Sequence, residues 1–253
     1  DYVWADGIVA SVTPESWDSI VIDDMPIGRY ASYTAILHHK TPSVSDTPEA
    51  WAEYSADLRG SLLVSRAMTR LRTREDPSHA LVFNALYPAN RVFAETMRKD
   101  GVILLNVSAG PTVPRRYSTL ALYDGIKASQ TLTDSAVFRA SVDVPASELE
   151  ILHVERHLAH LMSAADPWVY SAAASRRPAS QIREQLGVRA DSPVVTVIIS
   201  SPDETRASLM VDAEFHRDPV NGYSDVAEFV RAATDLSRER PDCDFVFRLH
   251  PRL

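Results

Sequence analysis

Apolar residues recur along this chain with two spacings, one typical of helices and one typical of buried strands. Helical spacing predicts helices over residues 30–39, 47–74 and 89–99. The second of these has a strong start signal in Thr47-Pro48-Glu49. Threonine caps a helix, proline suits its first position, and an acid favours its positive end. Continuous apolar runs predict short buried strands over residues 17–22, 80–83 and 102–107.

The order of these elements predicts parallel strand pairs. A strand, a helix and a strand follow one another over residues 80–107, and short connections of this kind join parallel neighbours. The order recurs over residues 194–199, 224–238 and 245–249. The β-branched run at 194–199 predicts a strand buried on both faces. Residues 153–165 and 180–186 are expected to be helical.

These patterns predict an α/β fold with two Rossmann-like halves. The first half is an N-terminal domain of residues 1–175, and the second is the start of a C-terminal domain of residues 176–253. Residues 108–150 show no clear periodicity and remain without an assigned element.

Composition narrows the functional classes. A formal net charge of -8 and a sequence pI near 5.5 disfavour a nucleic-acid-binding protein, which usually carries a basic face. Cys243 is the single cysteine, so no internal disulfide forms, which suits the cytoplasm. No apolar run approaches the roughly 18 residues of a membrane span. The glycine-rich dinucleotide fingerprint, the P-loop and the Gly-x-Ser-x-Gly elbow do not occur.

Polar residues follow several predicted strands where parallel sheets bind their ligands, beyond the carboxyl ends. Ser200 and Ser201 open a strand-to-helix turn that continues with Asp203 and Glu204. Hydroxyls and backbone amides of such a turn hold phosphate or sugar hydroxyls, and the alternative is simple helix capping.

His250 and Pro251 follow the last predicted strand. Proline fixes the backbone there, and an imidazole donates to an anionic oxygen near neutral pH. The alternative is a histidine that bonds to a neighbouring loop. Arg252 adds positive charge to the same segment.

Together these short motifs resemble one group of bacterial enzymes. The turn Ser200-Ser201-Pro202-Asp203-Glu204, a helix, and a strand that ends in Arg248-Leu249-His250-Pro251 are similar to the capsule-polysaccharide and Kdo-transferase-like glycosyltransferases of GT-B fold. The segments Phe83-Asn84, Asn90-Arg91 and Pro26-Ile27-Gly28-Arg29-Tyr30 also resemble the first domain of that group.

The resemblance implies a transferase that needs no cofactor and no catalytic metal. Its substrates would be a nucleotide sugar and a saccharide or glycolipid acceptor, and the full-length protein could associate peripherally with a membrane. His250 would contact the donor phosphate. The other donor-side residues carried over are Ser200, Ser201, Glu204, Pro251 and Arg252.

The acceptor side would be lined by Asn84 and Arg91. A carboxylate of the first half would act as general base in an inverting transfer, and Asp23 and Asp24 are the candidates, between which the sequence does not choose. Arg115 and Arg116 would hold an acidic acceptor, or else belong to a solvated loop.

The chain departs from the group's pattern after His250, because that group continues with further strands and helices that hold the nucleotide. We therefore expect an incomplete C-terminal half, and we expect this chain to bind a donor weakly or to be an inactive fragment. The alternatives are a non-catalytic carbohydrate- or nucleotide-binding protein, or a nucleotide-sugar epimerase or polyol-phosphate transferase of related fold. The spacing of His153, His157 and His160 places them on one face of a predicted helix. They would form either a metal site or a surface cluster.

Overall fold

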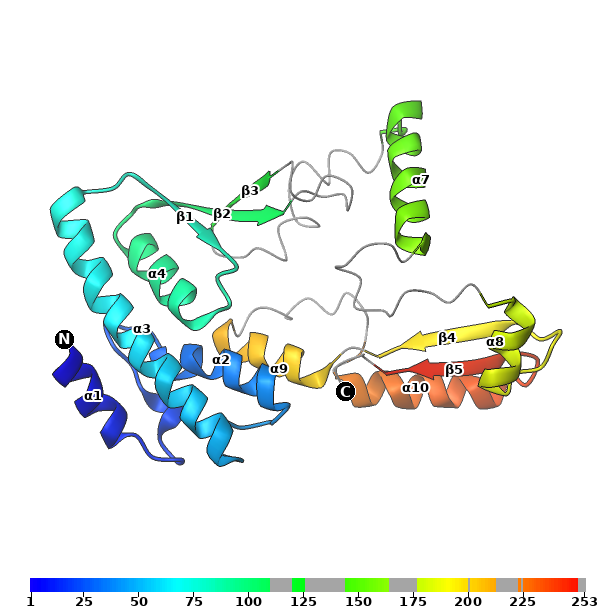
Figure 1. The fold of residues 1–253 in the computed structure, drawn as a ribbon, viewed down its shortest axis with the longest axis horizontal. Helices are drawn as coiled ribbons and strands as arrows, with labels where there is room; N and C mark the ends of the chain where they lie inside the picture. Colours follow the sequence, from blue (N-terminus) through cyan, green and yellow to red (C-terminus); the bar gives the residue numbers. More distant parts are fainter. Residues whose placement is uncertain are drawn as a thin grey trace. The chain divides into compact units, whose positions relative to one another are not determined.

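The computed structural model describes residues 1–109, 120–125, 144–163, 177–199, 201–212, 223 and 225–249 (Figure 1). They form a mixed α/β structure with short parallel strand pairs, which confirms the α/β part of the predicted fold class, while the two Rossmann-like halves stay a prediction. The chain divides into two compact units: Asp1–Glu148 with Asp203–Phe215, and Leu149–Pro202 with His216–Leu253. The predicted domain boundary at 175/176 lies outside the described residues and stays a prediction.

The first unit contains a helical layer. Its elements are α1 (Tyr2–Ser11), the 3-10 turn η1 (Trp17–Ser19), α2 (Ile27–His39), α3 (Pro48–Glu75), α4 (Pro88–Lys99) and α9 (Pro202–Val211), the last belonging to this unit from Asp203 onward. Helix α3 begins as predicted, because the amide of Ala50 donates a 3.1 Å hydrogen bond to Oγ1 of Thr47. Helices α1 and α9 were not predicted.

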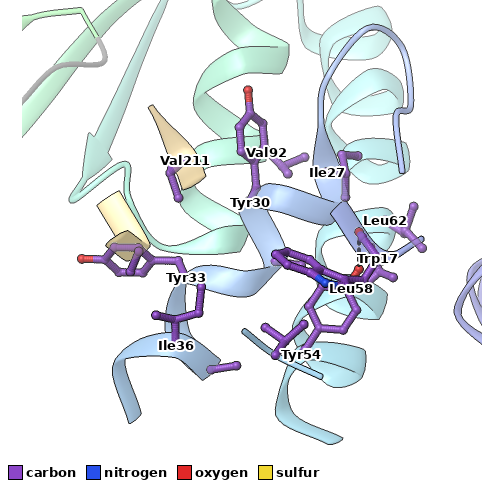
Figure 2. Packing of buried hydrophobic residues seen from close by; sticks show 14 of the residues in the cluster. Trp17, Ile27, Tyr30, Tyr33, Ile36, Tyr54, Leu58, Leu62, Val92 and Val211 are labelled. Atoms are coloured by element: carbon purple, nitrogen blue, oxygen red, sulfur yellow. Dashed lines mark hydrogen bonds between the residues drawn. The ribbon is translucent and has the colours of Figure 1, made fainter. Parts of the chain in front are cut away.

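The main core of this unit surrounds α2 (Figure 2). Ile27 and Ile36 of α2 are fully buried, as are Tyr54 and Leu58 of α3. Val211 of α9 joins the same cluster. Helix α2 packs against several partners because its buried positions spread round much of its circumference, including small residues that permit close approach.

A three-stranded sheet completes the first unit. Strands β1 (His79–Phe83) and β2 (Ile103–Ala109) are parallel, as predicted, and β3 (Leu120–Asp124) is antiparallel to β2. Helix α4 covers one face through a core that includes Val82, Met97 and Leu104. The opposite face carries the exposed side chains of Leu81, Phe83 and Ile103, so β1 is buried on one side only.

The prediction of a strand at residues 17–22 is wrong. Residues Trp17–Ser19 form a 3-10 turn, and Ile22 makes only an isolated bridge with Met25. The carbonyl of Ile20 accepts a 3.1 Å hydrogen bond from the amide of Gly28. Of the apolar side chains, Trp17 is buried, Ile20 and Ile22 are partly buried and Val21 is exposed. The backbone groups of this segment bond to helices and turns rather than to a neighbouring strand.

The second unit contains α7 (Glu148–Ser163, from Leu149), α8 (Ala179–Leu186), β4 (Val194–Ile198), α10 (Val226–Glu239) and β5 (Asp244–Arg248). Strands β4 and β5 are parallel, in agreement with the predicted order. Burial of β4 on both faces is wrong, because Val195 and Ile198 are exposed while Val197 packs with Phe229 of α10. None of the helices in the described ranges is long and apolar enough to cross a membrane.

Candidate functional site

The predicted donor residues follow two neighbouring strands. Val194 of β4 pairs with Asp244 of β5, and the register continues to Ile198 and Arg248. One further bond joins the amide of Ile199 to the carbonyl of Arg248 at 3.0 Å. Strands β4 and β5 therefore end next to each other at the same edge of the sheet.

Within the donor turn, the structure describes Ser201 and Glu204. Ser201 is fully buried, and Glu204 lies half-buried in the first turn of α9, beside the buried Asp203. The helix begins at Pro202, so its acids sit where the helix dipole favours negative charge. Ser200, His250, Pro251 and Arg252 lie outside the described residues, and so do Arg115 and Arg116.

Asn84 builds the turn at the carboxyl end of β1. Its backbone is left-handed, with φ 48°, a conformation that asparagine tolerates better than most residues. Its Oδ1 accepts a hydrogen bond from the amide of Leu86 at 3.2 Å, and Nδ2 of Asn90 donates to the carbonyl of Phe83 at 2.6 Å. Both asparagines thus shape the entry into α4.

Arg91 joins α4 to α2. Its side chain is buried, with Nη2 3.0 Å from Oε1 of Glu95 and Cζ 5.3 Å from the ring centroid of Tyr30. Burial raises the pKa of the Tyr30 phenol, and the negative charge of Glu95 adds to this rise. The structure therefore brings together two motif segments that are distant in sequence. Arg91 is engaged inside the protein, and its role toward an acceptor stays a prediction.

Arg98 reaches the same glutamate from the outside. Its Nη2 lies 2.9 Å from Oε2 of Glu95, while its own side chain remains exposed. Glu95 consequently pairs with one buried and one exposed guanidinium. Its single negative charge offsets one of the two positive charges, so a net positive charge remains at this point of α4.

Asp23 and Asp24 form the centre of a two-residue turn. Both have positive φ, 48° and 60°, and the flanking Ile22 and Met25 exchange backbone hydrogen bonds of 3.0 and 2.9 Å. This is the geometry of a tight hairpin turn, which aspartate tolerates. The Asp24 side chain is fully exposed, and Nζ of Lys99 lies 3.8 Å from its Oδ2. The strand that was expected to present these acids is absent at 17–22.

Asn106 is a polar core residue that sequence reasoning missed. It lies in the middle of β2, opposite Val82 in the parallel register, and its side chain is fully buried. The signal was present as an asparagine inside the apolar run Leu104-Leu105-Asn106-Val107. A buried amide costs stability unless it is hydrogen-bonded, so this position is a polar exception within the core of the sheet.

One Asp-x-Asp triplet, Asp242-Cys243-Asp244, occurs in the chain, a spacing that GT-A enzymes use to hold a metal. Here Asp242 pairs with Arg240 at 2.7 Å, and Asp244 pairs with Arg189 at 3.0 Å. A hydrogen bond from Ser192 holds the pKa of Asp244 below its ordinary value, with help from Arg189. The triplet lies at the amino end of β5, the edge opposite the predicted donor site.

The histidine, cysteine and acidic side chains of the described residues form no metal-binding cluster. No group of three or more histidine, cysteine or acidic side chains there could hold a metal ion, which includes the described part of α7 with His153 and His157. His38 and His39 instead bond the two carboxylate oxygens of Glu53, at 2.7 and 2.9 Å. This cluster ties α2 to α3.

A surface cleft of about 670 Å³ lies at the amino ends of β1 and β2. Arg72, Asp76, Ser78, Asp100 and Gly101 are among its lining residues, and Arg72 pairs with Asp100. Parallel sheets bind ligands at the opposite edge, so this cleft does not coincide with the predicted site.

Comparison of the chain with known protein families, with curated proteins and with solved structures found no match.

Proposed function

We propose that this chain is part of a glycosyltransferase that moves a sugar from a nucleotide-sugar donor to a surface-polysaccharide or glycolipid acceptor. The observation that carries the proposal is the parallel pairing of β4 with β5. It supports a common location for the Ser200-Ser201 and His250-Pro251 motifs, which lie about fifty residues apart in the sequence. The proposed architecture is two Rossmann-like halves of GT-B type.

In this proposal, positive groups stabilise the departing nucleotide phosphate. His250 and Arg252 would donate to the phosphate oxygens, and hydroxyls of Ser200 and Ser201 would bind the donor. The acceptor hydroxyl loses its proton to a carboxylate base, for which Asp23 and Asp24 are the candidates. The oxygen then attacks the anomeric carbon of the donor sugar as the bond to the phosphate breaks. No metal is proposed to assist.

A second candidate is a non-catalytic protein that binds a nucleotide or a carbohydrate. The exposed hairpin position of Asp24 favours it, since a general base normally lies in a sheltered site. Burial of Arg91 favours it as well, because that guanidinium is already paired with Glu95.

The cytoplasm is the proposed compartment. Nucleotide-sugar chemistry is expected there, and the single cysteine fits a reducing environment.

Thermal unfolding of the full-length protein tests the proposal. We would use CMP, CDP, UDP, GDP and their common sugar conjugates as ligands. A ligand at about 100 times its Kd adds about 2.7 kcal/mol of stability. Stabilisation by one nucleotide and its sugar conjugate, followed by release of the nucleotide when an oligosaccharide acceptor is supplied, supports transfer. Stabilisation without release supports the binding protein, and no stabilisation by any ligand contradicts both.

A further inference from the structure

Polar contacts attach helix α9 to α2 near both of its ends. Near the start of α9, Nζ of Lys40 lies 2.9 Å from Oδ2 of Asp203. Near its end, Nη2 of Arg29 donates a 3.1 Å hydrogen bond to the carbonyl of Leu209. Lys40 caps the C-terminus of α2 and Arg29 lies in its first turn, so the two helices run antiparallel.

Both contacts agree with the dipole of α9. An acid in the first turn and a cation at the last carbonyls are each favoured by the helix ends. Between them, Ala207 and Val211 are buried in the core around α2, where Figure 2 labels Val211. Apolar packing therefore holds most of α9 against α2. The Lys40–Asp203 pair adds a polar attachment at Asp203, the first residue of α9 that belongs to this unit.

The backbone of Lys40 is unusual for a lysine. It adopts a left-handed conformation, with φ 53° and ψ 36°, in the place where a helix most often ends with glycine. A lysine in this conformation is strained relative to glycine, at a cost on the order of 1 kcal/mol. The side chain reaches a carboxylate that is 7% exposed, so the ion pair is largely shielded from water.

Asp203 is adjacent in sequence to predicted donor-binding residues. Asp203 comes directly after Ser201 and Pro202 and directly before Glu204, all within the turn that follows β4. Fixing Asp203 therefore fixes the backbone of the residues on either side of it. We propose that Lys40 is a positioning residue, which holds the donor-binding turn in place through its ion pair with Asp203. This inference rests on the proposed function, which makes this turn part of the donor site.

Replacement of Lys40 by glycine separates positioning from folding. Lys40→Gly removes the ammonium group beside the shielded Asp203 carboxylate, which lowers stability, and relieves the left-handed strain, which offsets part of that loss, so the variant should still fold, with a modestly lower melting temperature. Hydrogen exchange of the amides over residues 201–206 should become about five-fold faster or more, because the turn has lost its attachment. Affinity for the nucleotide that stabilises the wild-type protein, among CMP, CDP, UDP and GDP, should fall by a similar factor. Lys40→Arg should restore both properties.

Arg29→Met is the matched control, because it releases the other end of α9. It should speed exchange near residues 209–212 and leave nucleotide affinity within about two-fold of wild type. The proposal is overturned if Lys40→Gly leaves exchange at 201–206 unchanged, or if exchange rises while nucleotide affinity stays the same. Failure of the wild-type protein to bind any of the four nucleotides refutes the proposed function, while the exchange measurement still decides whether Lys40 anchors the turn.

Discussion

The phenol of Tyr54 donates a 2.8 Å hydrogen bond to the backbone carbonyl of Trp17, and both groups are buried (Figure 2). The two rings also meet edge to face, with centroids 5.8 Å apart. This contact fixes the 3-10 turn η1 onto α3, in the segment where the sequence predicted a strand. Desolvation raises the pKa of the Tyr54 phenol well above its ordinary value, so the hydroxyl keeps its proton at every physiological pH.

Removal of this hydroxyl should destabilise the protein. Tyr54→Phe leaves the Trp17 carbonyl without its donor, at a cost of about 1–2 kcal/mol in the free energy of unfolding. Urea unfolding monitored by circular dichroism measures the change. Tyr87→Phe is the control, because Tyr87 is partly exposed and its contact with Tyr33 is between rings. Equal stability of the two variants would contradict a structural role for the Tyr54 hydroxyl.

Two helical glycines should respond oppositely to alanine. A Cβ at Gly28 would lie 2.1 Å from the carbonyl oxygen of Trp17, so Gly28→Ala forces α2 away from η1 and should cost about 3 kcal/mol or more. A Cβ at Gly60, inside α3, meets nothing within 4 Å. Gly60→Ala should therefore stabilise by about 0.5–1 kcal/mol. Differential scanning calorimetry of the two variants checks both signs, and a destabilised Gly60→Ala would refute the assignment.

The two arginines that share Glu95 should differ in importance. Arg91→Met removes the buried partner of a shielded carboxylate, and we expect a loss of about 2–3 kcal/mol. Arg98→Met removes an exposed partner of the same carboxylate, and we expect a loss below about 1 kcal/mol. Chemical unfolding of both variants measures the difference. If Arg98→Met proved the more damaging, Arg91 would not be the link between α4 and α2.

Asp57 should make stability depend on pH. Burial raises the pKa of its carboxyl, a hydrogen bond from Thr34 opposes this, and Glu53 adds to the rise. Because the folded-state pKa lies above the unfolded value, the folded state holds the proton more tightly. Asp57 thus costs stability at pH values above its folded pKa, and this cost disappears as pH falls through the folded pKa toward the unfolded one.

Asp57→Asn tests this sign. The variant should be more stable than wild type at pH 7, by up to about 1 kcal/mol, and the advantage should vanish near pH 4. Melting temperatures across this pH range measure the effect. An advantage that grows as the pH falls would mean that Asp57 is stabilising in its ionised form.

Signals carried by residues close together in the sequence correctly predicted the start of α3 and the parallel pairing of strands. The Thr47 cap and Pro48 place the start of α3 at the observed residue, since capping needs only neighbouring backbone. The strand–helix–strand order likewise predicted the parallel β1–β2 pair, because a short crossover leaves few other arrangements, and the same order predicted the parallel β4–β5 pair.

Predictions that depend on contacts between residues far apart in the sequence were less accurate. Residues 17–22 have the apolar content of a strand, but Gly28 and Tyr54 supply their hydrogen-bond partners, and these are contributed by α2 and α3. The start of α9 was read only as a turn, although Pro202 and the acids after it are ordinary helix-start signals. Spacing also did not reveal that Arg91 would be buried against Tyr30.

The central claim is a donor site at the ends of β4 and β5. Calorimetry tests it most directly, by comparing the affinity of the full-length wild-type protein and of its His250→Ala variant for the nucleotide sugar that stabilises the wild type. His79→Ala, on the first strand of the other unit, is the matched control. Loss of a charge-assisted hydrogen bond to the donor phosphate should weaken binding about ten-fold or more in His250→Ala, and His79→Ala should bind as wild type does. Unchanged affinity in His250→Ala would contradict a donor site at the ends of β4 and β5.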